Sequence, residues 1–162
     1  MKLSMAINTI RQIYGNEMTV KVIAMYVTKA VCDELKIEEP EICTYTRRSN
    51  ETACFVPESK QIGINMYHVN ELVQSVSGSN MKSLYTLVEF IVHEARHAWQ
   101  YAGNMEIPKN YVSGKTNNKF DEYWNQPIEI DARDYAKKNY QRYCHMAEAN
   151  IVGMAEYMLE EM

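Results

Sequence analysis

The apolar positions of residues 18–37, "MTVKVIAMYVTKAVCDELKI", recur at intervals of three and four. This is the period of one face of an α-helix, so we predict an amphipathic helix over this segment. The polar "EEPE" that follows ends the helix. The repeating positions are Val20, Ile23, Ala24, Val27, Val31 and Leu35.

Three short runs of β-branched and aromatic residues come next along the chain. They are "ICTYT" (42–46), "TACFV" (52–56) and "QIGINM" (61–66), separated by "RRSNE" and by "PESK". Such runs between turn-forming residues predict short strands, the last two joined by a hairpin that contains a proline. The spacing favours a small antiparallel sheet, or a mixed one, and with the flanking helices this makes the fold class α+β.

The helical period returns between residues 80 and 102. Placing residues at about 100° per step puts six apolar side chains on one face. His93 and His97 lie on nearly the opposite side with Thr86 and Phe90, and Val92 and Trp99 flank them. We therefore expect a helix that is buried on more than one side, with its histidines toward an interior cleft. The apolar face consists of Leu84, Leu87, Val88, Ile91, Ala95 and Ala98.

Residues 103–127 have no clear period and are rich in Gly, Pro, Asn, Ser and Lys. Loops of this length are usually functional or mobile. Pro127 then opens a second long helical pattern, and proline is well placed in a first helical turn. Within that pattern, Gly153 is a candidate for a break. Met146, Met154, Met158 and Met162 suit either adaptable packing of the last helix or a partner surface.

Size and charge limit the classes of function. A chain of 162 residues with 46% apolar composition is expected to form one domain over residues 1–162. The net charge is −4 and the 17 basic residues are scattered, which argues against nucleic acid as a ligand. No segment resembles a signal peptide or a membrane span. Four cysteines far apart, without a C-x-x-C pair, favour reduced thiols in the cytoplasm: Cys32, Cys43, Cys54 and Cys144.

The stretch "VHEARHAWQ" (92–100) contains the motif His-Glu-x-x-His. Spacing of four places the rings of His93 and His97 on one helix turn, where both can bind a metal ion. Glu94 lies nearby without pointing at the metal, which suits a proton acceptor for an activated water. The alternative without a metal is a hydrogen-bonded histidine pair on a buried helix, because so short a motif also arises by chance.

A hydrolytic zinc site needs a third protein ligand and one open position for water. We favour Glu129, in the first turn of the helix that follows the long loop, where a carboxylate also gains from the helix dipole. Asp131, Asp134 and His145 remain alternatives. The full set of downstream candidates is Asp121, Glu122, Glu129, Asp131, Asp134 and His145.

"HEARH" followed by "PIEIDARDYA" resembles the glutamate-zincin pattern, His-Glu-x-x-His and then Glu-x-x-Ala on a later helix, of small intracellular metallopeptidases of the ImmA/IrrE type. The resemblance covers roughly residues 41–140. It includes "QIGIN", where those proteins have an edge strand, and the aromatic-Ala pair Tyr135-Ala136. Between the motif's glutamate and second histidine the family commonly has Leu-Gly, whereas this chain has Ala95-Arg96.

The resemblance implies a zincin-like fold with Zn²⁺ bound by His93, His97 and Glu129, and with Glu94 as general base. The implied function is hydrolysis of a peptide or protein substrate, which would add in extended form to an edge strand at residues 61–66. One alternative is a catalytically inactive zincin-fold binding or regulatory module of the phage or mobile-element type. Another is a helical interaction protein without stoichiometric metal.

Several other residues are candidates for supporting roles. Asp131 and Asp134 are possible acceptors for a ligand histidine N–H, or else face solvent. His68 is expected to be a surface or capped histidine, and Trp99 and Trp124 are expected to be core anchors. Any of several tyrosines is a possible donor to a substrate oxyanion, although most must serve packing: Tyr101, Tyr111, Tyr123, Tyr135 and Tyr143.

Overall fold

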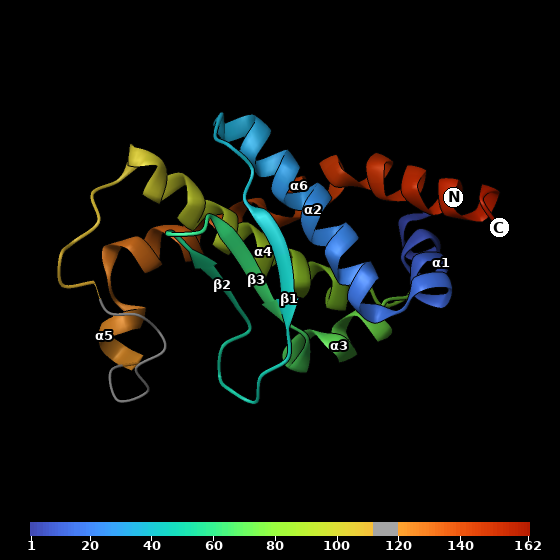
Figure 1. Cartoon of the computed structure of the whole chain (residues 1–162), viewed down its shortest axis with the longest axis horizontal. Helices are drawn as coiled ribbons and strands as arrows, with labels where there is room; N and C mark the ends of the chain where they lie inside the picture. The colour runs from blue at the N-terminus through green and yellow to red at the C-terminus, as the bar shows by residue number, and fades with distance from the viewer. Residues whose placement is uncertain (112–119) are drawn as a thin grey trace.

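The computed structural model describes residues 1–111 and 120–162 and shows an α+β fold (Figure 1). The described part contains six α-helices, one π-helical segment and a sheet of three strands. Their bounds are α1 (Leu3–Tyr14), α2 (Asn16–Leu35), β1 (Glu41–Tyr45), β2 (Ala53–Val56), β3 (Gln61–Asn65), α3 (Met66–Gln74), α4 (Lys82–Trp99), the π-helical η1 (Gln100–Asn104), α5 (Phe120–Trp124) and α6 (Pro127–Glu160).

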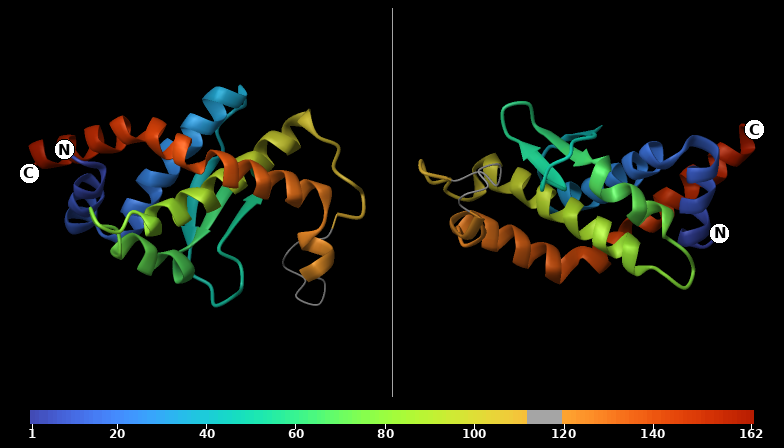
Figure 2. Two further views of the ribbon diagram at one scale, coloured as in Figure 1. Left: turned by 180° about the vertical axis from the view of Figure 1, so that it is seen from behind. Right: turned by 90° about the horizontal axis from the view of Figure 1, so that it is seen from below.

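The elements form layers, which the view from below shows most clearly (Figure 2). The sheet covers one side of α4, and α6 packs along the opposite side. Helix α2 contacts β1, α4 and α6, and it fills the middle layer beside α4. This arrangement makes α4 the central element of the fold, with neighbours on both sides.

The sheet is mixed and has the strand order β1-β3-β2. β2 and β3 form the expected antiparallel hairpin, but β1 runs parallel to β3, with Glu41 opposite Gln61 and Tyr45 opposite Asn65. The expectation that residues 61–66 form an edge strand is therefore wrong, since β3 is central. Period-two alternation gives each strand a buried face but does not state which strand is its neighbour, so the sequence left this order open.

The long helices agree with the sequence pattern. α2 matches the predicted amphipathic segment, and Lys36, in the left-handed conformation at φ 59°, ends it. α6 begins at Pro127 as expected, but it continues through Gly153, so the expected break there is wrong. Residues 3–14, 66–74 and 120–124 also form helices, to which the sequence pattern had assigned no element.

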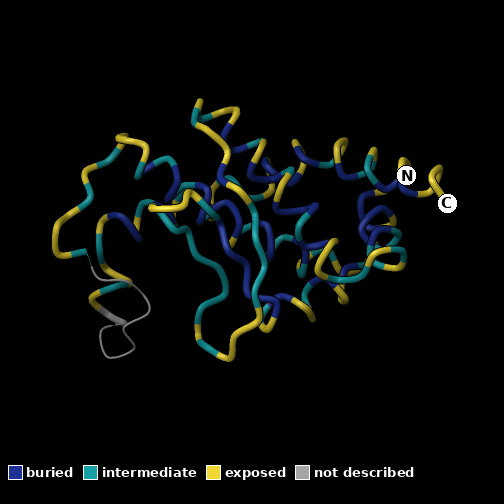
Figure 3. Tube along the Cα trace, in the orientation of Figure 1, coloured by how far each residue is buried: buried dark blue, intermediate teal, exposed yellow. Residues whose placement is uncertain are grey.

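The core is built mainly from α1, α2, α4 and α6, and β3 and α3 add to it. The burial colours along the chain show the buried stretches of these elements in dark blue (Figure 3). All six apolar positions predicted for one face of α4 are buried, and so is Val92 on another face. Trp124 is 43% exposed and lies against the Arg133 guanidinium, and Trp99 is half-buried against Arg96, so neither tryptophan is a core anchor. None of the described helices combines the length and apolar character that a membrane crossing would need.

Candidate metal centre

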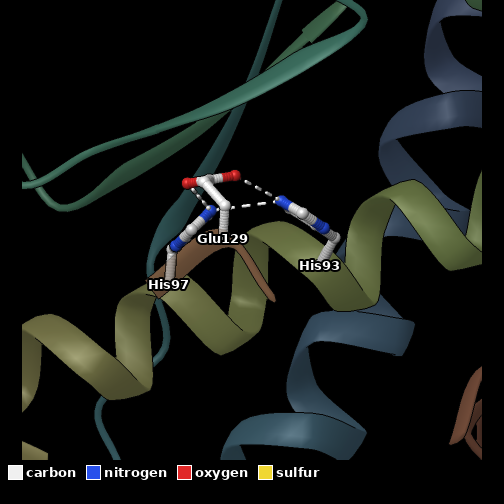
Figure 4. A group of neighbouring side chains, drawn as sticks. All are labelled: His93, His97 and Glu129. Carbon is white, nitrogen blue, oxygen red and sulfur yellow. Dashed lines mark hydrogen bonds and ion pairs between the residues drawn. The ribbon is translucent and has the colours of Figure 1, made fainter. Parts of the chain in front are cut away.

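His93, His97 and Glu129 meet at the contact between α4 and α6 (Figure 4). The histidines come from successive turns of α4, and Glu129 comes from the first turn of α6, where the Gln126 carbonyl accepts its backbone N–H. The Glu129 carboxylate lies 3.3 Å from His93 Nε2 and 3.0 Å from His97 Nε2. The two Nε2 atoms are 3.1 Å apart. The side chain that we favoured as third ligand is therefore next to both histidines.

The donor atoms of these three residues lie close enough to share one cation. The two Nε2 atoms are 3.1 Å apart, and each faces a different oxygen of Glu129: His97 lies 3.0 Å from Oε2 and His93 3.3 Å from Oε1. One ligand atom from each residue lies within 4.8 Å of the other two. Two imidazole nitrogens and one carboxylate oxygen also form a donor set that zinc accepts. The group thus has the ligand types and the proximity to hold a metal ion.

Burial strengthens the charge interactions among these three side chains. Glu129 is 1% exposed and His97 6% exposed. Burial alone would lower the pKa of His97, yet its hydrogen bond to Glu129 and the nearby carboxylates raise that pKa to about 9. Burial would raise the pKa of Glu129, but hydrogen bonds to His93 and His97 hold it well below its usual range. A buried carboxylate paired with imidazoles is the environment in which positive charge is stabilised.

Glu94 follows His93 directly and is 8% exposed. Its burial raises the pKa of the carboxyl, and the adjacent His93 and His97 offset only part of this effect. Glu129 and Glu51 add to the increase because both are negative. A carboxylate in such a place binds a proton more readily than one in water, so Glu94 has the property of a proton acceptor.

The second nitrogen of His97 reveals a residue that the sequence analysis missed. His97 Nδ1 lies 2.7 Å from Gln100 Oε1, and Gln100 is fully buried. Asp131 hydrogen-bonds Gln100 and Arg96, and Asp134 is exposed. Neither aspartate accepts from a ligand histidine: Asp134 faces solvent, which is the other alternative that the sequence left open, and Asp131 is half-buried. The spacing of three residues between His97 and Gln100 is the sequence signal for this contact, but spacing alone does not distinguish a buried amide from an exposed one.

Two tyrosines lie beside the third ligand. Tyr111 donates from its hydroxyl to Glu129 Oε2 at 2.7 Å. Tyr123 is also hydrogen-bonded to Glu129, and burial together with this carboxylate raises the pKa of its phenol. Tyr135 and Tyr143 hydrogen-bond each other, and Tyr143 hydrogen-bonds Glu34 of α2. Of the five tyrosines considered from the sequence, Tyr111 and Tyr123 therefore have direct contacts at the centre.

The alternative ligands lie elsewhere or outside the described side chains. His145 and Glu122 are exposed and do not belong to the His93, His97 and Glu129 group. The side chain of Asp121 lies outside the described residues. His68 hydrogen-bonds the Ser49 carbonyl at the end of the sheet, in agreement with a capped histidine.

No known family model, curated protein or solved structure matches this chain.

Proposed function

We propose that this protein is a zinc-dependent peptidase with a zincin-like fold, similar to the ImmA/IrrE type. The observation that carries the proposal is the convergence of His93, His97 and Glu129 at ligand spacing, with buried Glu94 beside them. The resemblance of "HEARH" and "PIEIDARDYA" to the glutamate-zincin pattern supports it. In this proposal the two histidines and Glu129 hold the metal.

When bound, zinc would supply the acidity that activates a water molecule at an open coordination position. Glu94 takes a proton from that water as the water oxygen bonds to the carbonyl carbon of the peptide, because burial makes its carboxyl a better base than a solvated one. Glu94 then passes the same proton to the amine that leaves as the peptide bond breaks. Tyr111 and Tyr123 are the donors that we assign to the substrate carbonyl oxygen: both hydroxyls hydrogen-bond Glu129, and one of them would exchange that bond for one to the substrate.

The substrate class follows from the sheet beside the centre. Among the described strands, β2 pairs with β3 on one side only, and it packs against α4. Phe55 of β2 lies 5.8 Å from Tyr101 between ring centroids, next to the helix that bears the histidines. An extended peptide can hydrogen-bond to such an edge. We therefore assign peptide binding to β2, in place of the central strand β3.

The test replaces the proposed base and a matched glutamate of the same helix. The zinc-loaded protein is incubated with a proteome-derived peptide library, and new peptide termini are identified by mass spectrometry. Glu94→Gln should lose at least about 100-fold in cleavage rate, with one zinc per chain retained in elemental analysis. Glu89→Gln, five positions earlier on α4, should cleave as the wild type does. Equal cleavage by Glu94→Gln and wild type would refute the role of Glu94.

A second candidate, a metal-stabilised binding module that hydrolyses nothing, is favoured by the burial of the centre. Glu94, His97 and Glu129 are each less than one-tenth exposed, and the His93 side chain is 20% exposed. In this case zinc would link α4 to α6 and would only stabilise the fold. The same library experiment separates the two functions: stoichiometric zinc without any cleavage by the wild type supports the binding module.

A further inference from the structure

We propose that Gln100 is a positioning residue of the metal centre, which fixes the tautomer of His97 and links α4 to the turn that bears Glu129. The inference rests on the proposed function only in placing a cation at the centre. It does not require that the protein cleave peptides.

The orientation of the Gln100 amide follows from its neighbours. Its nitrogen lies 2.8 Å from the Ile128 carbonyl oxygen and 2.8 Å from Asp131 Oδ2. Both of these partners can only accept, since one is a carbonyl and the other a carboxylate. The amide NH₂ must therefore point at them. Rotating the amide by 180° would place its oxygen against two acceptors, so this orientation is the one that satisfies all the groups.

The amide orientation in turn determines the proton on His97. With its nitrogen on the α6 side, Gln100 presents Oε1 to His97 Nδ1 at 2.7 Å. A carbonyl oxygen accepts, so Nδ1 must be the protonated ring nitrogen. His97 Nε2, which hydrogen-bonds Glu129 at 3.0 Å when no cation is present, is then the ring nitrogen that is left to bind a cation. Gln100 thus holds His97 in the tautomer that a metal ligand requires.

The same side chain joins the two ligand-bearing helices. Ile128 directly precedes Glu129, so the bond from Gln100 to the Ile128 carbonyl connects the His97 turn to the Glu129 turn. Asp131 is held in place by Arg96, whose Nε and Nη2 lie 2.8 and 3.2 Å from its oxygens.

Arg96 is itself enclosed between two aromatic rings. Its guanidinium lies 3.6 Å from the centroid of Trp99 and 4.2 Å from that of Tyr135. These contacts restrict the rotamers of Arg96 and, through it, of Asp131. Gln100 is fully buried, with no exposed surface, so water cannot replace its hydrogen bonds without a change in packing. Gln100, Asp131 and Arg96 thus form one fixed hydrogen-bonded unit next to His97.

Gln100 lies in a regular helical backbone. Its dihedral angles are φ −59° and ψ −48°, so it continues the helix that bears His97 into the segment η1. The helical path ends only at Gly103, which has φ 93°. The amide therefore projects from a helical turn that is continuous with the turn of His97.

The first experiment compares two variants with the same chemical change. Gln100→Leu removes the amide at similar volume, and Gln74→Leu makes that change at the exposed end of α3. Zinc affinity is measured by competition with a chromophoric chelator. Gln100→Leu should bind zinc about 10–100-fold more weakly than the wild type, and Gln74→Leu should bind it equally well. A folded Gln100→Leu protein with zinc affinity within about twofold of wild type would overturn the proposal.

The second experiment needs no variant. In the zinc-loaded wild type labelled with ¹⁵N-histidine, NMR should show His97 Nδ1 protonated and slow to exchange, with Nε2 as the ligand. Zinc bound through Nδ1, or an Nδ1–H that exchanges as fast as in free imidazole, would also overturn the proposal. These results are independent of the library assay. Normal cleavage and unaltered zinc binding by Gln100→Leu would reject the role of Gln100 without contradicting the proposed peptidase activity.

Discussion

The side chain of Asn65 links three segments of the chain, and its removal should destabilise the fold strongly. It is fully buried at the end of β3 and caps α3 by accepting the Tyr67 N–H at 3.2 Å. It also accepts the Arg47 N–H at 3.0 Å and donates to the Arg47 and Glu51 carbonyls, both at 2.8 Å. One amide thus satisfies four backbone groups, three of them in the connection between β1 and β2.

The cost of Asn65→Ala can be worked out from these contacts. A hydrogen bond of this kind contributes about 1 kcal/mol net, and the loss of an N-cap alone costs about 1 kcal/mol. Four bonds therefore amount to about 4 kcal/mol, a large share of the roughly 5–15 kcal/mol that holds a typical domain folded. With a urea dependence of about 2 kcal/mol per molar, the unfolding midpoint should fall by roughly 2 M.

Urea unfolding followed by circular dichroism measures this change. Asn70→Ala is the matched control, because Asn70 is exposed on α3 and accepts one surface hydrogen bond, from Asn16. It should alter stability by no more than about 0.5 kcal/mol. Asn65→Asp should not restore the wild-type midpoint, since a carboxylate cannot donate to the Arg47 and Glu51 carbonyls. A fall of less than about 0.5 M for Asn65→Ala would refute the reasoning.

Three further predictions concern the metal, a helix and pH. Zinc at 100 times its dissociation constant should add about 2.7 kcal/mol of stability, which raises Tm by roughly 5–10 °C in calorimetry; His97→Ala should abolish the increase, and an equal increase in that variant would place zinc elsewhere. Gly153→Ala should stabilise the protein by about 0.5–1 kcal/mol in urea unfolding, because an added Cβ meets no atom within 4 Å; destabilisation would contradict a continuous α6. Hydrogen bonds from Arg142 and Tyr143 hold the pKa of Glu34 below its unfolded value, so Glu34→Gln should lower the free energy of unfolding at pH 7. The loss relative to wild type should shrink as pH falls through the lowered folded pKa; a loss that stays constant down to about pH 3 would argue against this linkage.

The sequence pattern predicted those parts of the candidate site that lie on one helix. The period of residues 80–102 placed His93 and His97 together and away from the apolar face, and the structure confirms that the Leu84 to Ala98 face is buried. Glu129 was favoured because Pro127 indicated the start of the next helix, and it lies at both histidines. Gln100 was not considered, although it lies three positions after His97, because a buried amide has no distinctive sequence pattern.

What the sequence determined by itself is local: the helical periods of α2, α4 and α6, the approximate bounds of the strands, and the presence of His93, Glu94 and His97 on one helix. Only the tertiary structure decided that β3 is central and parallel to β1, that α6 packs against α4 with Glu129 facing the histidines, and that Gln100 joins the two helices. The physical reason is that periodicity reports which side of an element avoids water. The choice of neighbour depends on packing and hydrogen bonds between residues far apart in the chain, which no local pattern records.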